Sequence, residues 1–164
     1  MKIGICSDSH DHVHHMELAI AAFKEKGVEA IIHAGDFVAP FMVETLREAG
    51  VPVHGVYGNC DGEKAGLARQ FEGLGELHRE PHIFELGGKR LVVMHHPEWV
   101  SAFAHPELAD VVIHGHTHEL FVEKRDVWIV NPGEVFGRRS KNGPTVAVYD
   151  TDRDEIEILH LKTA

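Results

Sequence analysis

Several features that mark whole classes of protein are scarce or missing in this sequence of 164 residues. It contains only two cysteines, Cys6 and Cys60, and their spacing matches neither a Cys-x-x-Cys pair nor a zinc ribbon. Two such cysteines are most simply free thiols in a reducing compartment. No apolar run approaches the roughly 20 residues that cross a bilayer, and the chain reaches the acidic Asp8 too early for a signal peptide. We therefore expect a cytoplasmic protein with no membrane partner.

An excess of basic charge is also missing. The chain has 16 lysines and arginines against 26 acidic residues, a formal net charge of -10 with histidine neutral. Because sequence-independent binding of nucleic acids needs a basic surface, stable nucleic-acid binding is not expected. Bound divalent cations can still make one cleft positive, so the acidity does not exclude a phosphate substrate. With no internal repeat, low-complexity tract or linker, one domain is expected over residues 1–164.

Histidine, in contrast, is abundant. The chain contains 15 histidines, and imidazole is the commonest metal-binding side chain. Scattered histidines are more often surface residues than ligands. We expect four of them to lie at the surface: His54, His78, His82 and His160.

Apolar runs and helical periodicity alternate in the first third of the chain. One helix is expected with its apolar face from Met16 to Phe23, and a second over residues 41–49. Three strands are expected before, between and after these helices: residues 2–6, 30–34 and 51–57. A β-α-β-α-β order of this kind implies parallel strands with right-handed crossovers.

The second half of the chain has a different pattern, in which short turns separate paired apolar runs. Another buried strand is expected over residues 111–114. Hairpins are expected between three pairs of segments: 83–86 with 90–94, 120–123 with 127–130, and 145–150 with 155–161. The fold class is therefore α/β, in part α+β, with two packed mixed β-sheets flanked by helices.

Metal-capable side chains follow the ends of successive expected strands. The carboxyl ends of parallel strands share one edge of a sheet, and ligands bind at that edge. Seven such side chains come just after a strand: Asp8, His10, Asp36, Asn59, His95, His116 and His118. Their oxygen and imidazole donors suit Mn, Fe, Co, Ni or Zn better than Ca or Mg. One metal takes about four to six ligands, so seven donors fit two metals that share a bridging carboxylate.

The order of these motifs resembles the calcineurin-like metallophosphoesterase superfamily, specifically its small prokaryotic phosphodiesterase branch. The similarity covers nearly the whole chain and is carried by five motifs: Asp8-Ser9-His10, Gly35-Asp36, Gly58-Asn59-Cys60-Asp61, His95, and Gly115-His116-Thr117-His118. The segment Asn131-Pro132-Gly133 matches a loop of the same branch and is expected to be a structural turn.

The resemblance implies a four-layer sandwich with a dinuclear metal centre at one end. Two divalent transition-metal ions are expected, with manganese as the first candidate and nickel, cobalt, iron and zinc as alternatives. Asp8, His10 and His118 would bind one metal, Asn59, His95 and His116 the other, and Asp36 would bridge them. The implied reaction is attack of a metal-bound hydroxide on the phosphorus of a small phosphate ester. Four residues are expected to be catalytic: Asn59, Cys60, Asp61 and His95.

Two departures from the family pattern bear on the substrate. Cys60 stands where many members have a histidine that protonates the leaving group or steadies the transition state. We expect the change to favour diesters, or esters with good leaving groups; the alternative is that Cys60 is a partly buried thiol with no role in the reaction. Pro97 stands where related enzymes often have a second histidine, a candidate substrate contact, and His96 is an alternative contact.

One alternative belongs to another class of function. The retromer subunit with this fold is an interaction platform, so a non-catalytic metal-binding scaffold is the second hypothesis. Proteins of that kind tend to lose ligands, whereas all seven positions are filled here. The sequence is compatible with a homo-oligomer but does not indicate one.

Overall fold

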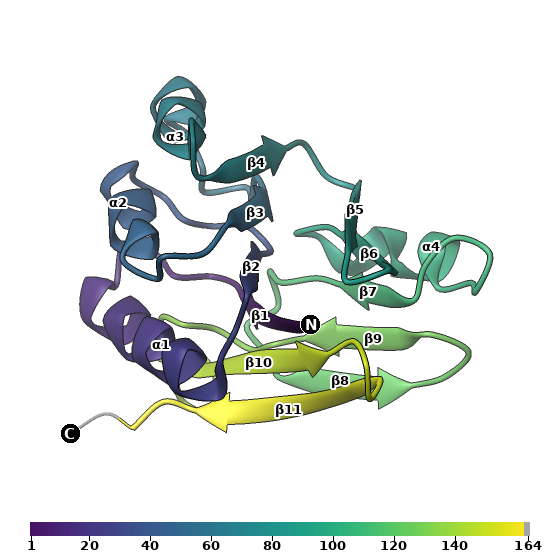
Figure 1. Ribbon diagram of the computed structural model, residues 1–164. Coiled ribbons are helices and arrows are strands. Elements are labelled where there is room, and N and C mark those ends of the chain that lie inside the picture. Colours follow the sequence, from purple (N-terminus) through teal and green to yellow (C-terminus); the bar gives the residue numbers. More distant parts are fainter. Residues whose placement is uncertain (163–164) are drawn as a thin grey trace.

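The computed structural model describes residues 1–162 and consists of four layers (Figure 1). Helices α1 (Val13–Lys26), α2 (Phe41–Arg47) and α3 (Lys64–Phe71) cover the outer face of a six-stranded sheet. A five-stranded sheet packs against its other face, and α4 (Val100–Phe103) lies outside that second sheet. The prediction of two mixed sheets flanked by helices is therefore confirmed.

The first sheet combines the two ends of the chain. It is ordered β11-β10-β1-β2-β3-β4, and β1 to β4 run parallel. Its strands are β1 (Lys2–Cys6), β2 (Ala30–His33), β3 (Val53–Val56), β4 (Gly75–His78), β10 (Thr145–Asp150) and β11 (Glu155–His160). The C-terminal hairpin of β10 and β11 joins this sheet because β10 pairs antiparallel with β1.

The second sheet is ordered β5-β6-β7-β9-β8. Its strands are β5 (His82–Leu86), β6 (Lys89–Val93), β7 (Val111–Ile113), β8 (Phe121–Lys124) and β9 (Trp128–Asn131). The edge strands β5 and β8 pair antiparallel with β6 and β9, respectively, whereas β6, β7 and β9 run parallel to one another. Those parallel strands align their carboxyl ends, as β1 to β3 do in the first sheet.

Alternation along β1 shows how the core is built. Ile3 and Ile5 face the second sheet and are completely buried, while Gly4 faces the helices. A Cβ at Gly4 would lie 3.0 Å from the Phe23 ring, so glycine lets α1 pack closely against the strand. The core therefore fixes β1 from both sides, and the loop that follows it starts from a rigid base.

Two elements of the first sheet region were not predicted from the sequence, namely α3 and β4. Both are short, and β4 is an edge strand whose residues are only partly buried or exposed. Between residues 1 and 162, no helix is long and apolar enough to cross a membrane.

Candidate metal centre

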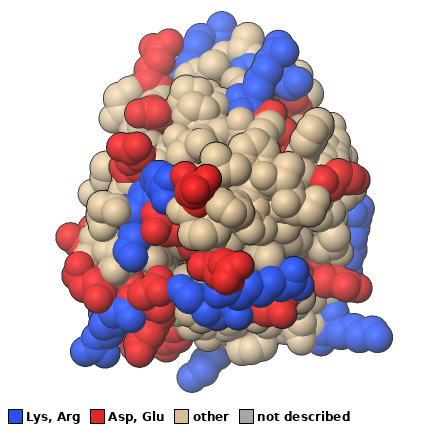
Figure 2. All heavy atoms as spheres, turned by 90° about the vertical axis from the view of Figure 1, so that its right-hand side faces the viewer, with Lys and Arg blue, Asp and Glu red and all other residues tan. Residues whose placement is uncertain are grey.

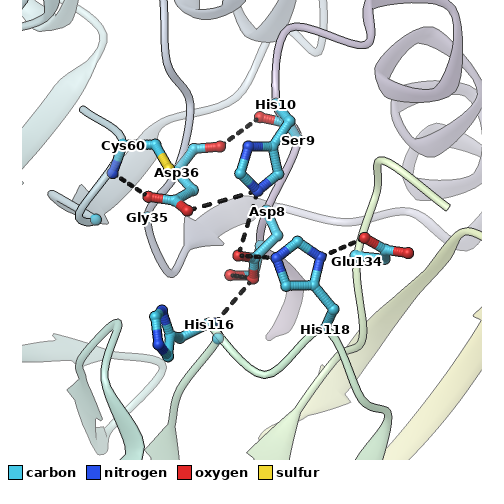
Figure 3. Close-up of polar contacts among 12 residues, drawn as sticks. Asp8, Ser9, His10, Gly35, Asp36, Cys60, His116, His118 and Glu134 are labelled. Carbon is cyan, nitrogen blue, oxygen red and sulfur yellow. Dashed lines mark hydrogen bonds and ion pairs between the residues drawn. The ribbon is translucent and has the colours of Figure 1, made fainter. Parts of the chain in front are cut away.

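The seven donors predicted from the sequence lie together at one end of the sandwich, where strands of both sheets end. Figure 3 shows five of them: Asp8, His10, Asp36, His116 and His118. The loops after β1, β2, β3, β6 and β7 supply the seven in that order: Asp8 with His10, Asp36, Asn59, His95, and His116 with His118. The predicted convergence is therefore present in the structure.

The first group of donors consists of Asp8, His10 and His118, whose ligand atoms all lie within 4.8 Å of one another. Asp8 Oδ1 is 3.4 Å from His118 Nε2 and 3.8 Å from His10 Nε2. The rings of His10 and His118 are stacked with their centroids 5.1 Å apart. Asp8 is completely buried, and the two imidazoles are largely so.

The second group consists of Asn59, His95 and His116. Asn59 Oδ1 is 3.0 Å from His95 Nε2 and 2.9 Å from His116 Nδ1. The two ring nitrogens are 3.3 Å apart. Asn59 is exposed and His95 is completely buried, so this group connects the interior to the surface.

Asp36 lies between the two groups. Its Oδ2 is 3.5 Å from His10 Nε2 and 3.4 Å from His95 Nε2. Its other oxygen, Oδ1, accepts the backbone N–H of Cys60 at 2.8 Å. One carboxylate oxygen thus faces a nitrogen of each group.

The arrangement fits bound metal ions. Metal–ligand bonds of about 2.0–2.2 Å place neighbouring donors about 2.8–3.6 Å apart. The separations given above run from 2.9 Å to 3.8 Å. Moreover, Asp8 Oδ1 and His10 Nε2 are buried and have no hydrogen-bond partner among the described residues. A shared cation would satisfy both atoms, which would otherwise be costly to bury.

Hydrogen bonds fix the orientation of two imidazoles. His95 Nδ1 lies 2.8 Å from the Ala34 carbonyl oxygen, and His118 Nδ1 pairs with the Glu134 carboxylate (Figure 3). Both partners accept hydrogen bonds, so each Nδ1 carries a proton, and each ring in its neutral form would present the lone pair of Nε2 to the centre. Metal ligation requires that tautomer.

Glu134 was not identified as a site residue from the sequence. Its side chain is completely buried, and Oε1 accepts the backbone N–H groups of Arg139 and Ser140, each at 2.6 Å. The preceding turn positions it: Asn131 binds the Gly115 carbonyl oxygen at 3.2 Å and so holds the turn against the loop of His116 and His118. This contact agrees with the structural role predicted for the turn.

Glu80 is a second unpredicted contact. One oxygen accepts the backbone N–H groups of both His95 and His96, and the other pairs with His96 Nδ1. Glu80 therefore holds the backbone at the end of β6. His96 is half-buried beside His116, with ring centroids 4.6 Å apart.

The ligand loops also hold unfavourable backbone conformations. Eight described residues other than glycine have positive φ, and seven of them lie in these loops: Asp8, His10, Asp11, Asp36, Val38, His116 and His118. A β-branched residue such as Val38 at φ 81° is a marked outlier. Such conformations cost about 1–3 kcal/mol each and cluster at functional sites.

The four residues predicted to be catalytic occupy different environments. Asn59 and Cys60 are exposed at the mouth of the site, whereas His95 lies in its wall. Asp61 is buried below the ligand loops and accepts three backbone N–H groups, those of Asp36, Val38 and Gly58, at 2.7–3.0 Å. Both its oxygens are thereby used in joining two ligand loops.

Charges within the centre shift several pKa values. Burial opposes ionisation of Asp36, but hydrogen bonds from His95 and Cys60 outweigh it and lower its pKa. Burial likewise opposes the imidazolium of His95, but neighbouring Asp36 raises its pKa to about 9. Burial and the nearby Asp36 raise the pKa of Cys60 to about 11, so its sulfur is a neutral thiol at pH 7. Metal binding must therefore displace a proton from His95.

A basic side chain adjoins the first group. The Arg139 guanidinium lies 3.3 Å from His118 Nε2, and its positive charge favours the thiolate of Cys60. Arg139 therefore lies at the same mouth of the site as Cys60.

Comparisons with known proteins agree with this geometry. Residues 1–154 match the sequence model of the calcineurin-like phosphoesterase superfamily domain. The phosphodiesterase MJ0936 of Methanocaldococcus jannaschii is 37% identical over 170 residues, covering 99% of this chain and 100% of the relative.

Solved structures show the same relationship. A structure described as a novel archaeal phosphodiesterase superposes with a TM-score of 0.90 at 33% identity, covering 97% of this chain and 99% of the other. Vps29 of Chaetomium thermophilum superposes with a TM-score of 0.69 at 15% identity, covering 97% and 93%. At that identity the likeness to Vps29 concerns the fold alone.

Proposed function

This chain belongs to the calcineurin-like phosphoesterase superfamily, and from that premise we propose that it is a phosphodiesterase with a dinuclear metal centre. Asp8, His10 and His118 would hold one divalent transition-metal ion. Asn59, His95 and His116 would hold the second. The relative MJ0936 is named a phosphodiesterase, which supports the reaction class.

The position of Asp36 carries the proposal. Its Oδ2 lies 3.5 Å from a nitrogen of the first group and 3.4 Å from a nitrogen of the second. A carboxylate in that position can bridge two ions, while its other oxygen is held by the Cys60 N–H. The mixed oxygen and imidazole donors favour manganese, with nickel, cobalt, iron and zinc as alternatives.

The bound ions would supply an activated water at neutral pH and neutralise charge on the phosphoryl oxygens. The chain itself supplies orientation. Glu134 and the Ala34 carbonyl oxygen fix two imidazole tautomers, and Asp61 fixes the two loops that carry Asp36 and Asn59. We assign Asp61 a positioning role on these contacts.

A diester is the favoured substrate because of the residues at the mouth. Cys60 is exposed there, and its thiol, with a pKa raised to about 11, is a poor proton donor compared with an imidazolium. Arg139 would hold a phosphoryl oxygen. Beside Asn59 a cavity of about 350 Å³ is lined by Tyr57, Lys64 and His96 and would take one ester substituent.

The charge distribution favours a small substrate over a nucleic-acid polymer. On the face shown in Figure 2, acidic and basic side chains are mixed at the top and along the lower half, and uncharged residues lie between these two regions. The described residues on this face form no broad basic surface of the kind that sequence-independent binding of a phosphate backbone needs. Both cysteines are free thiols, which a reducing compartment maintains, so we place the enzyme in the cytoplasm.

Activity after metal reconstitution tests the proposal. Metal-stripped protein would be reloaded in turn with Mn, Ni, Co, Zn or Mg and assayed on bis-p-nitrophenyl phosphate and p-nitrophenyl phosphate. We expect metal-dependent turnover that favours the diester and is lost in Asp36→Asn. Asp126→Asn, which changes an exposed turn, is the matched control and should keep activity. Absence of turnover with any metal, in protein that binds two ions, would favour the scaffold alternative instead.

A further inference from the structure

We propose that a second, separate metal site lies between the free edges of the two sheets and binds one zinc-class divalent ion through Glu76, His78 and His82. The ligand atoms of these three residues all lie within 4.8 Å of one another. Glu76 and His78 belong to β4, and His82 begins β5. The site is built from different residues than the metal centre described above.

Strand alternation brings the three side chains into one gap. On β4, Leu77 packs toward the helices, so Glu76 and His78 point the other way, toward the second sheet. On β5, Phe84 belongs to the core between the sheets, and His82 shares its face. Because β4 and β5 are the edge strands of their sheets, the three side chains meet where the sandwich opens to solvent.

The contacts within the cluster bring the three side chains within reach of one ion. The rings of His78 and His82 are stacked, with centroids 3.6 Å apart and planes inclined by 6°. His78 Nε2 is 3.0 Å from Glu76 Oε2. Tetrahedral zinc with bonds of about 2.0–2.2 Å needs donors about 3.3–3.6 Å apart, so the two stacked rings would turn out of their parallel arrangement to direct one nitrogen each at a shared ion.

A further histidine lies next to the cluster. His54 on β3 is opposite Glu76 in the strand register, and its ring also adjoins Phe84, with centroids 5.4 Å apart. Its Nδ1 is buried and has no hydrogen-bond partner within residues 1–162. His54 is not among the residues whose ligand atoms lie within 4.8 Å of one another, so the proposed site rests on Glu76, His78 and His82.

The donor atoms of Glu76, His78 and His82 determine which kind of ion the site would bind. Two imidazoles and one carboxylate suit Zn²⁺, Ni²⁺ or Cu²⁺ better than Mg²⁺ or Ca²⁺. The bound ion would tie β4 to β5 across the segment of residues 79–81, which joins them. That segment contains Glu80, whose carboxylate holds the backbone of His95 and His96. The proposed site is therefore structural, and it would stiffen one support of the metal centre.

Polar residues that face inward on edge strands have another use, since they discourage edge-to-edge association of sheets. Protection of the sheet edges requires no metal, so a count of bound zinc distinguishes it from the proposed metal site. Metal-stripped protein would be dialysed against Zn²⁺, and bound zinc per chain would be counted for the parent and for Glu76→Gln, His78→Gln and His160→Gln. Glu76 is exposed, so its substitution leaves the core intact.

The expected result is one fewer zinc ion per chain in Glu76→Gln and in His78→Gln, and no change in His160→Gln, whose histidine is exposed on β11. This difference of one ion does not depend on how many ions the centre around Asp36 holds. In the unmutated protein, the ring nitrogens of His78 and His82 should also shift in nitrogen NMR spectra when zinc is added. Equal zinc counts in all four proteins, with both rings unshifted, would overturn the proposal.

Discussion

Substitution of Glu134 by glutamine tests whether a buried carboxylate sets the metal-binding form of His118. The two side chains have nearly the same shape, but an ionised carboxylate accepts with both oxygens, whereas an amide accepts with one end and donates with the other. In the structure both ends of Glu134 accept: Oε2 from His118 Nδ1, and Oε1 from the backbone N–H groups of Arg139 and Ser140.

A glutamine side chain cannot accept hydrogen bonds at both ends. If its oxygen turns toward His118, its NH₂ group faces two backbone N–H donors, which leaves buried donors unsatisfied at about 1–3 kcal/mol. If its oxygen keeps the two backbone donors, the NH₂ group faces His118 Nδ1. That nitrogen must then accept, so the proton moves to Nε2 and blocks the ligand position.

Either arrangement is expected to lower metal affinity and activity by a similar amount. Loss of a partner that orients a metal-bound histidine costs about 10–100-fold in metal affinity or activity, which corresponds to about 1.4–2.8 kcal/mol. We expect a loss of that size in Mn²⁺ affinity, measured by competition with a chelating dye, and in kcat/KM for bis-p-nitrophenyl phosphate. Glu119→Gln is the matched control, since Glu119 is exposed next to His118 and should behave as the parent.

Glu134 does not set the tautomer of His118 if folded Glu134→Gln keeps both Mn²⁺ affinity and kcat/KM within threefold of the parent. Folding would be checked by thermal unfolding, because the lost hydrogen bonds also lower stability. A variant that is destabilised but retains full metal affinity at 25 °C would show that His118 keeps its tautomer without Glu134.

Three further substitutions have defined outcomes. Cys60→His should raise turnover of p-nitrophenyl phosphate relative to the diester, because an imidazolium protonates a poor leaving group better than a thiol does; an unchanged ratio would remove Cys60 from substrate selection. Arg139→Ala should raise KM for the diester about tenfold with metal content unchanged, as measured by steady-state kinetics, and an unaltered KM would contradict a phosphate contact. Asp61→Ala should lower the free energy of unfolding by about 3 kcal/mol in urea, because three buried N–H groups lose their acceptor; a loss below 1 kcal/mol would contradict its positioning role.

Most of the fold could be predicted because the core strands have a strong apolar pattern. β1, β2 and the hairpin of β5 and β6 were placed within one or two residues. The neighbour of each strand in the sheet was harder to predict from the sequence. Nothing in the apolar run 145–150 indicates that it pairs with β1, because a hydrophobic strand pattern identifies a buried strand and not its neighbour.

The missed elements lack that pattern. β4 contains only one residue, Leu77, that packs toward the helices, and it begins with Gly75. α3 has Gly66 in its interior, which weakens a helical signal. A Cβ at Gly66 would lie 2.7 Å from Pro40, so the glycine reflects the close approach of α3 to the start of α2.

The ligands could be predicted, but their supports could not. Each ligand follows a strand, so its place in the chain carries the information. Glu134 and Glu80 lie 16 and 15 residues away in sequence from the histidines that they hold. A single acidic residue in a loop has no pattern of its own, and only the turn before Glu134 marked that segment.

The central claim is that two ions act together around Asp36, and a metal titration followed by activity tests it most directly. Metal-free protein carrying Glu76→Gln, so that the edge site adds no ion, would receive Mn²⁺ in steps while bound metal and diester turnover are measured together. We expect turnover to remain low at one ion per chain and to rise to its maximum as the second binds. Full turnover at one ion per chain, unchanged by the second, would contradict it.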